Sequence, residues 1–262
     1  FNAGIGNVVV HNTDSVFAKF NLQNDDGSYP VTDVEKVQKS IDIGLEIQER
    51  LLKEDVFPVP HILEYEKVFF PFLLITKKRY IGIKYEFDAK IGKKTSMGVV
   101  TKRRDNAPIL KHTFIGVVDI LMKEKNIGKA VQFVKDICYQ MIDGEFELNM
   151  FVISKTLRDF YKDPESIAHK VLADRMAERD PGNKPSSNER IPYVYINIDE
   201  KPGVEYLQGD RIEHINYVRE HNCKVDYETY VNNQLIKPIS QIFELVVEKL
   251  PGYPYNNIPD YF

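Results

Sequence analysis

Residues 62–86 read ILEYEKVFFPFLLITKKRYIGIKYE, and this stretch decides the fold of the first part of the chain. Two runs, 62–76 and 79–87, are rich in Phe, Ile, Val and Tyr, which is typical of β-strands. The basic tetrad Lys77-Lys78-Arg79-Tyr80 lies at their junction. The sequence therefore predicts two neighbouring strands with a cluster of cations where they meet.

The segment before these strands predicts a hairpin and a helix. β-prone runs at 8–10 and 16–20 flank a polar turn. Thr32 and Glu35 have the spacing of a capping box, in which each residue satisfies a backbone N–H of the other. The helical apolar spacing that follows predicts a helix over about 33–53.

After the basic segment the apolar spacing becomes helical, beginning at residue 113. Asp163-Pro164 is a typical start for a helix that continues to about Met176. The remaining elements are expected to be an exposed loop over 178–190, a strand over 191–198 and a long helix over 226–250. Whether Pro238 breaks this long helix stays open. This order predicts an α+β fold, in which a sheet with a helix is followed by a mostly helical part, with a boundary near Asp105.

Composition excludes several classes of protein. The chain has 262 residues, of which 43% are hydrophobic and 28% are charged, as in ordinary globular proteins. No apolar run approaches the roughly 18 to 20 residues that span a bilayer. Two cysteines exclude a disulfide scaffold and a Cys-rich zinc module, and the six histidines lack the spacing of metal ligands.

The net charge of −4 hides a strongly basic segment. Residues 77–111 carry eleven Lys and Arg against three Asp and Glu, so this segment is +8 and the rest of the chain is −12. Local basic surface, and not net charge, determines affinity for phosphate. The segment is a candidate phosphate-binding surface, and the alternative is a solvated face of scattered lysines.

Six segments in chain order resemble the family B DNA polymerases, in the branch of eukaryotic polymerase delta and large DNA viruses. They are Thr13-Asp14-Ser15-Val16-Phe17, residues 62–86, GVVTKRRDNAPILKHTF (98–114), Ile153-Ser154-Lys155-Thr156-Leu157, Arg190-Ile191-Pro192-Tyr193-Val194 and DYETYVNNQLIKPISQIF (226–243). The resemblance implies that 13–105 is the C-terminal part of the polymerase palm, an antiparallel sheet plus a helix. It implies that 106–262 is a mostly helical thumb.

The resemblance also implies a two-metal nucleotidyl transfer that uses Mg²⁺. Asp14, in a segment similar to the second half of Tyr-Gly-Asp-Thr-Asp-Ser, is the expected catalytic metal ligand, since Mg²⁺ prefers carboxylate oxygens. Glu64 and Glu66 alternate with Leu63 and Tyr65, so they are expected on one strand face. They are candidates for an accessory metal site, with a solvated strand face as the alternative.

Basic residues at the matching positions are expected to contact DNA without reading its sequence. Two arginines in the third match, residues 98–114, would hold template or primer phosphates, and two further residues are expected thumb contacts. The aromatic member of the tetrad is expected to pack beside the lysines. The complete set is Lys77, Lys78, Arg79, Tyr80, Arg103, Arg104, Lys155 and Arg190.

The residues before Thr13 depart from the polymerase pattern, which has Tyr-Gly-Asp there. They instead resemble the C-terminal end of an intein, which ends in His-Asn followed by Ser, Thr or Cys. Residues 1–12 are therefore expected to be an intein remnant. Asn12 would cyclise to a succinimide, His11 would assist by proton transfer, and Thr13 would supply a hydroxyl for transesterification.

We expect a C-terminal fragment of a DNA-templated DNA polymerase that extends a primer with dNTPs and is inactive alone. Its partners would be primer–template DNA, dNTPs and the missing N-terminal polymerase portion, with a sliding clamp as a candidate. The chain begins at Phe1 without a targeting signal, so an intracellular site of replication is expected, with no membrane and no secretion. Two alternatives stay open: a non-catalytic duplex-binding accessory chain, and the C-terminal precursor of a split, intein-containing polymerase.

Overall fold

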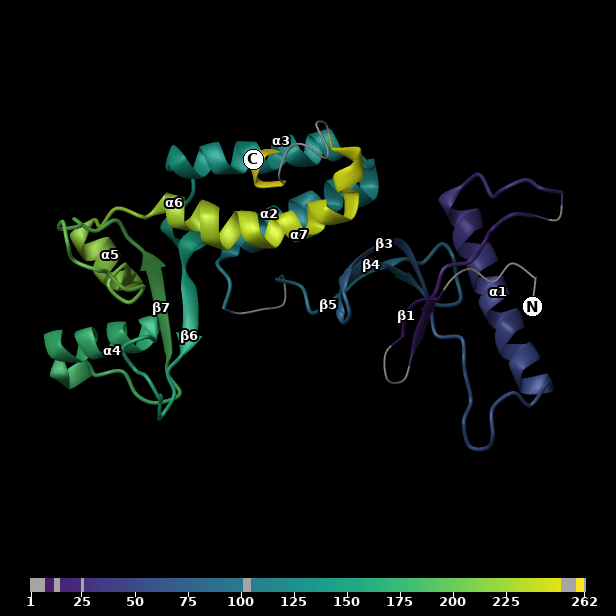
Figure 1. Ribbon diagram of the computed structural model, residues 1–262, viewed down its shortest axis with the longest axis horizontal. Helices are drawn as coiled ribbons and strands as arrows, with labels where there is room; N and C mark the ends of the chain where they lie inside the picture. The colour runs from purple at the N-terminus through teal and green to yellow at the C-terminus, as the bar shows by residue number, and fades with distance from the viewer. Residues whose placement is uncertain (1–7, 12–14, 25, 101–104, 251–257, 262) are drawn as a thin grey trace. The chain divides into compact units, whose positions relative to one another are not determined.

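The computed structural model describes the chain except residues 1–7, 12–14, 25, 101–104, 251–257 and 262 (Figure 1). The chain divides into two compact units, Phe1–Val99 and Val100–Phe262, which we call the N-terminal and C-terminal units. Both combine helices with small antiparallel sheets, so the predicted α+β class is confirmed. No helix among the described residues is both long and apolar enough to span a membrane.

The N-terminal unit begins with the predicted hairpin and helix. Strands β1 (Val8–His11) and β2 (Val16–Ala18) pair antiparallel, with His11 opposite Val16. Helix α1 (Asp33–Lys53) starts at the predicted capping box: Thr32 Oγ1 accepts from the Glu35 N–H at 3.2 Å. Glu35 Oε2 in turn accepts from the Thr32 N–H at 3.0 Å. The helix therefore begins where its first free N–H groups are satisfied.

A three-stranded antiparallel sheet follows, with β4 between its two partners. Its strands are β3 (Val68–Thr76), β4 (Arg79–Tyr85) and β5 (Lys93–Met97). Thr76 pairs with Arg79, so Lys77 and Lys78 alone form the turn between β3 and β4. Strand β5 was not predicted, because its sequence KKTSM lacks apolar alternation and its place in the sheet depends on pairing with β4.

The predicted strand at 62–76 begins only at Val68. Tyr65 explains the late start: its backbone N–H donates to Gln48 Oε1 at 2.6 Å, and its hydroxyl donates to the Glu86 carbonyl at 2.5 Å. Residues 62–67 are thus tied to α1 rather than paired with a strand. Partial burial, with a smaller effect of the nearby Glu86 charge, raises the pKa of Tyr65 to about 12.

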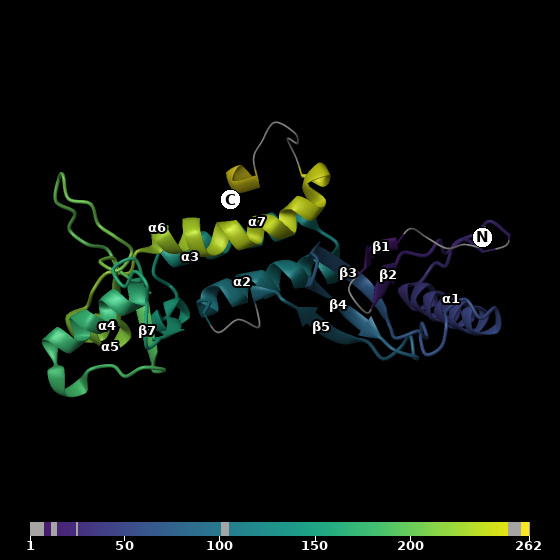
Figure 2. The same cartoon turned by 60° about the horizontal axis from the view of Figure 1, so that its bottom comes forward.

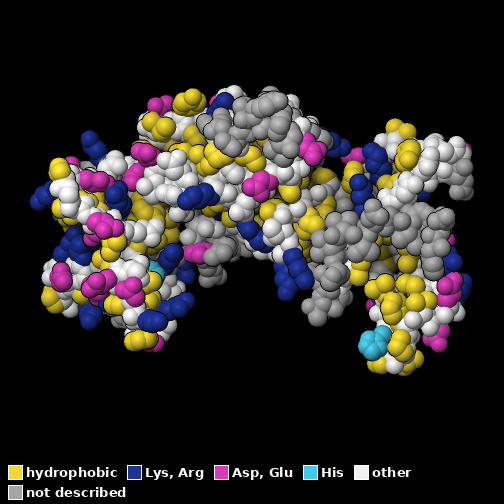
Figure 3. All heavy atoms as spheres, viewed as in Figure 1, with side chains coloured by type: hydrophobic (Ala, Val, Ile, Leu, Met, Phe, Trp, Pro, Cys, Tyr) yellow, Lys and Arg dark blue, Asp and Glu magenta, His cyan; other side chains and the backbone are white. Residues whose placement is uncertain are grey.

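The core of the N-terminal unit lies on both faces of β3. Phe70 packs with Val37 and Ile41 of α1. On the other side, the Phe17 ring from β2 stacks on Phe72 and lies tilted against Phe69. The loop between α1 and β3 adds less to this core, since it exposes a group of apolar side chains that Figure 3 shows in yellow: Val56, Phe57, Val59, Ile62 and Leu63.

In the C-terminal unit, α2 (Pro108–Asp119) and α3 (Ile127–Ile142) lie beside a long helical stretch over 227–249 (Figure 2). Pro108 stands in the first turn of α2, so this helix begins before the predicted residue 113. A π-helical segment, Ile120–Glu124, follows α2. The buried residues of these helices include Phe114, Val117, Ala130, Val134, Ile137 and Met141.

The long helix predicted over 226–250 has the expected extent but three helical geometries. Helix α6 (Tyr227–Thr229) leads into a π-helical segment (Tyr230–Ile236), helix α7 (Lys237–Phe243) and a 3-10 segment (Glu244–Lys249). Pro238 stands in the first turn of α7, where its missing N–H is tolerated. The π segment directly before it changes the hydrogen-bond register without ending the helix.

A second three-stranded antiparallel sheet contains β6 (Ile153–Thr156), β7 (Arg190–Tyr195) and β8 (Ile212–His214). Helices α4 (Ala168–Arg179) and α5 (Ile215–His221) contact strands β7 and β8 of this sheet. The unit also contains short 3-10 turns at Leu148–Phe151, Pro181–Asn183 and Ile258–Tyr261. Helix α4 begins after Ile167, so Asp163-Pro164 does not start it as predicted. Tyr230 joins the sheet to the long helix: its buried hydroxyl donates to the Phe151 carbonyl at 2.5 Å and accepts from the Tyr195 N–H at 3.1 Å.

Candidate functional site

The backbone of the turn at Lys77 and Lys78 lies close against Gly98. Lys78 has a positive φ of 63°. Gly98, which follows β5, also has a positive φ of 62°, and a Cβ added there would lie 2.3 Å from the Lys78 carbonyl oxygen. Only glycine allows this approach, because any other residue would collide with the turn. Gly98 is therefore a positioning residue that sequence reasoning did not single out.

The side chains at this turn carry unpaired positive charge. Lys77 and Lys78 are exposed and Arg79 is half-buried. Some other cations of the unit have acidic partners, such as Lys84, which pairs with Glu86 at 2.5 Å. Within the described part of the chain, Lys77, Lys78 and Arg79 have no such partner. We call these three residues the basic turn; its charges are available for an external anion such as a phosphate.

Tyr80 supports the basic turn from inside the unit. Its side chain is only 9% exposed. Its ring centroid lies 5.4–5.6 Å from those of Phe17, Phe69 and Phe72. This packing agrees with the expectation that Tyr80 packs beside the lysines, while a contact of Tyr80 with DNA stays a prediction from the sequence. We therefore assign Tyr80 a positioning role, in which the aromatic cluster fixes the start of β4.

Glu64 and Glu66 do not lie on a strand face as predicted, because β3 begins after them. Both are exposed, and Glu66 forms an ion pair with Lys67. No group of three or more His, Cys, Asp or Glu side chains that could hold a metal occurs in the described residues. The shared strand face is therefore wrong for Glu64 and Glu66, and their role in an accessory metal site stays a prediction from the sequence.

Several expected site residues lie outside the described part of the chain: Asn12, Thr13, Asp14, Arg103 and Arg104. His11 is the last residue of β1, so its backbone is described, but its side chain is not. The roles expected for all six remain predictions from the sequence.

The two expected contacts of the C-terminal unit lie on adjacent strands, β6 and β7. Lys155 is exposed on β6, opposite Ile191. Arg190 uses its guanidinium within the sheet: Nε donates to Ser154 Oγ at 3.1 Å and Nη1 to Thr156 Oγ1 at 3.2 Å. A further nitrogen, Nη2, donates to the Ser154 carbonyl at 2.5 Å. Arg190 thus connects the two strands, while Lys155 faces solvent.

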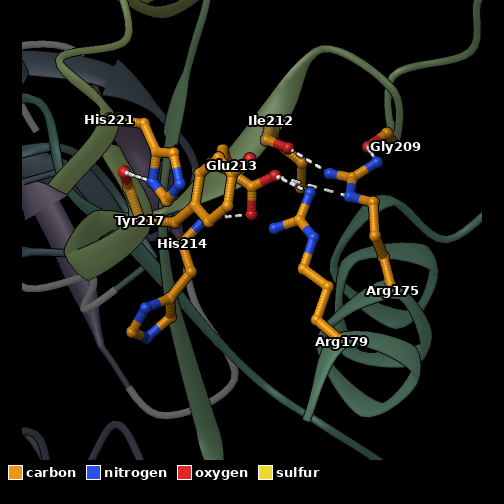
Figure 4. Close-up of polar contacts among 8 residues, drawn as sticks. All are labelled: Arg175, Arg179, Gly209, Ile212, Glu213, His214, Tyr217 and His221. Carbon is orange, nitrogen blue, oxygen red and sulfur yellow. Dashed lines mark hydrogen bonds and ion pairs between the residues drawn. The ribbon is translucent and has the colours of Figure 1, made fainter. Parts of the chain in front are cut away.

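A buried carboxylate, Glu213, is the second polar centre of this unit (Figure 4). Its side chain is 4% exposed and pairs with Arg179 at 2.9 Å and with Arg175 at 3.5 Å. The Arg179 guanidinium also lies 4.0 Å from the centroid of the Tyr217 ring, which stacks on His221 at 3.8 Å. Burial lowers the pKa of Arg179, but its hydrogen bond and charge pairing with Glu213 outweigh burial and raise it overall. The cluster binds α4 to β8 and α5.

Comparison with known proteins connects this geometry to one family. The chain matches the family model described as "DNA polymerase family B" over residues 6–246. It is 48% identical over 244 residues to a DNA polymerase of Pyramimonas orientalis virus, covering 93% of this chain and 20% of that one. It is 44% identical over 250 residues to a DNA polymerase of Acanthamoeba polyphaga mimivirus, and the match covers 95% of this chain and 14% of that one.

A DNA polymerase delta catalytic subunit from Glycine max is 33% identical over 242 residues, covering 92% of this chain and 21% of that one. The chain thus spans about a fifth of the length of such relatives, or less. The structure of a family B DNA polymerase from Pyrobaculum calidifontis matches with a TM-score of 0.53 and 21% identity, covering 76% of this chain and 24% of that chain. That likeness supports the fold.

Proposed function

The chain belongs to DNA polymerase family B, and we propose that it is the duplex-binding palm and thumb portion of a DNA-templated DNA polymerase. In this proposal residues 13–105 belong to the palm and 106–262 form the thumb. The complete enzyme would add dNTPs to a primer end. It would act inside the cell at the site of replication, and a sliding clamp is a proposed partner.

The basic turn is the observation that carries this proposal. Lys77 and Lys78 project from a turn whose backbone is fixed by Gly98, and no acidic side chain of the described residues neutralises them. Lysine is a flexible point charge, so such a turn suits a series of backbone phosphates better than a single shaped ligand. Contacts of this kind hold the duplex in register without reading its sequence.

We propose that catalysis needs carboxylates from outside this sequence. When bound, two divalent ions would activate the primer hydroxyl and neutralise the triphosphate. Asp14 is the ligand that the chain itself would contribute. Within this proposal the chain binds primer–template DNA but does not extend the primer alone.

Binding and extension can be tested on the same protein. Residues 1–262 are titrated into a fluorescein-labelled primer–template duplex, and anisotropy is recorded between about 0.05 and 0.3 M salt. We expect binding that weakens steeply as salt increases, because each phosphate contact releases counterions. Absence of binding at the lowest salt would reject the DNA-binding role. Primer extension by this chain with Mg²⁺ and dNTPs would reject the claim that it is catalytically incomplete.

Protein splicing at the Asn12–Thr13 bond is a second proposed function, supported by the His11-Asn12-Thr13 sequence. The Asn12 side-chain nitrogen would attack its own backbone carbonyl, so that a succinimide forms and the bond to the Thr13 nitrogen breaks. His11 would transfer the proton to the departing amine. The family match begins at residue 6 and so includes this segment, which leaves a divergent polymerase hairpin as the alternative.

Mass spectrometry of the purified chain after incubation tests the second proposal. Cleavage predicts a product that begins at Thr13 and a released peptide that ends in succinimide. Asn12→Ala should prevent it. A wild-type chain whose mass stays intact under conditions in which the protein remains folded would contradict splicing activity in this chain.

A further inference from the structure

The loop between α1 and β3 exposes five large apolar side chains within eight residues: Val56, Phe57, Val59, Ile62 and Leu63 (Figure 3). We call these five residues the apolar loop. Val59 is the most exposed of them, with 89% of its surface accessible. Single exposed apolar residues are common in proteins, but a group of them in one place is typical of an interaction surface.

Hydrogen bonds hold the backbone of the apolar loop at its start and at its turn. The Val56 N–H donates to the Leu51 carbonyl at 3.3 Å, and the His61 N–H donates to the Pro58 carbonyl at 2.9 Å. Directly after the loop, the hydrogen bonds of Tyr65 tie the chain to α1 and to the end of β4. Because the backbone is held in this way, covering the apolar side chains costs little conformational entropy.

The charges around the apolar loop disfavour nucleic acid and anionic lipid as its ligand. Residues 54–66 contain four carboxylates and no Lys or Arg, so they do not offer the positive charge that phosphate groups require. At the end of α1, Arg50 pairs with Glu54 at 2.8 Å and Lys53 pairs with Glu49 at 2.7 Å. An apolar centre with paired charges at its edge is typical of a protein–protein interface.

The small size of the apolar loop favours a partner that belongs to the same polypeptide. Stable interfaces between separate proteins use about 20–30 residues a side. Five side chains suit one part of an interface between tethered portions, because the tether gives a high effective concentration. The DNA polymerase of Pyramimonas orientalis virus contains much additional polypeptide, since the match to this chain covers only 20% of it.

We propose that the apolar loop packs against the N-terminal portion of the complete polymerase and joins the N-terminal unit to it. The surface that covers the loop is apolar at its centre. Cations at its edge would complement Asp55 and Glu64, which flank the loop and are exposed. This inference rests on the proposed function, in which the chain is one portion of a polymerase.

Isothermal titration calorimetry tests this contact with a defined probe, the portion of the Pyramimonas orientalis virus polymerase that precedes the segment matching this chain. Residues 1–262 should bind the probe. Val59→Ser/Ile62→Ser should weaken binding about 30-fold, because two apolar side chains are no longer buried in the contact. The control is Val204→Ser/Leu207→Ser in the C-terminal unit, where 52% and 50% of the two side chains are accessible and binding should not change.

The inference is overturned if the wild-type chain does not bind the probe, or if Val59→Ser/Ile62→Ser binds it as tightly as the wild type. Equal losses in the variant and the control would also overturn it, since they would indicate a general effect of surface substitution. Circular dichroism and thermal midpoints are measured in parallel and should be unchanged, because the substituted side chains are exposed.

Two further measurements identify the occupant and separate the inference from the proposed function. Analytical ultracentrifugation tests a second copy as the occupant: a dimer of the wild type that Val59→Ser/Ile62→Ser abolishes would overturn the proposal. In duplex anisotropy the same variant should bind primer–template DNA as the wild type does, because no cation is removed. A wild-type chain that binds the probe but not the duplex would reject the proposed DNA contact and support the contact of the apolar loop.

Discussion

Replacing both lysines of the basic turn by glutamine tests the proposed DNA contact most quantitatively. Lys77→Gln/Lys78→Gln removes two charges but keeps two long polar side chains. Glutamine and lysine should tolerate the positive φ at position 78 equally, so the turn should keep its shape. No ion pair is lost, since the described residues provide no acidic partner for either lysine. The expected change is therefore confined to binding of an external anion.

The magnitude follows from counterion release. Each neutralised phosphate contributes about 0.9 to the slope of the logarithm of affinity against the logarithm of salt. If each lysine binds one phosphate, the double variant should lower the slope by about 1.8. If the wild type and the variant have equal affinity near 1 M salt, the variant binds about 30-fold more weakly than the wild type at 0.15 M salt. At 0.05 M salt it binds about 200-fold more weakly.

The assay is anisotropy with two duplexes of unrelated sequence over the same salt range. The loss should be equal for both duplexes, because lysine contacts to phosphates carry no sequence information. The control is Lys53→Gln/Lys123→Gln, which removes the same charge from lysines paired with Glu49 and Asp119. An equal loss in this control, or a loss that depends on sequence, would refute the phosphate-contact reasoning.

Three further predictions concern residues inside the two units: Gly98, Tyr230 and His169. Gly98→Ala should lower the free energy of unfolding by about 2–3 kcal/mol, because it adds left-handed strain and a collision with the Lys78 carbonyl; an unchanged urea midpoint would contradict this. Tyr230→Phe should cost about 2–4 kcal/mol by leaving two buried backbone groups without a partner, and a loss below 1 kcal/mol would count against that estimate. The pKa of His169 is lower in the folded chain than in the unfolded chain, so as pH decreases the unfolded chain takes up the proton at a higher pH than the folded chain does. The free energy of unfolding should therefore fall as pH decreases below about 6.5. His169→Gln should flatten this dependence between pH 6.5 and 5.5, and an unaltered profile would assign it to another group.

Local signals predicted the elements that local chemistry determines. The capping box placed the start of α1, and the β-branched and aromatic runs identified β3 and β4. Strand β5 escaped prediction because a Lys-, Thr- and Ser-rich segment becomes a strand only by pairing with β4. The start of β3 was misplaced because the hydrogen bonds of Tyr65 to α1 and to Glu86 are tertiary.

The same distinction applies to the candidate site. The lysines of the basic turn were identifiable as a dense run of charge in the sequence. Gly98 was not, because its role appears only when β5 lies against the Lys78 carbonyl. Burial of the Tyr80 ring among three other aromatic rings was likewise a property of the folded unit.

Lysine footprinting tests the central claim most directly. Residues 1–262 are acetylated with and without a primer–template duplex at low salt, and the modification of each lysine is measured by mass spectrometry. The account predicts that DNA protects Lys77 and Lys78, that high salt removes this protection, and that Lys53 and Lys123 react equally in all samples. Equal reactivity of Lys77 and Lys78 with and without bound duplex would contradict the account.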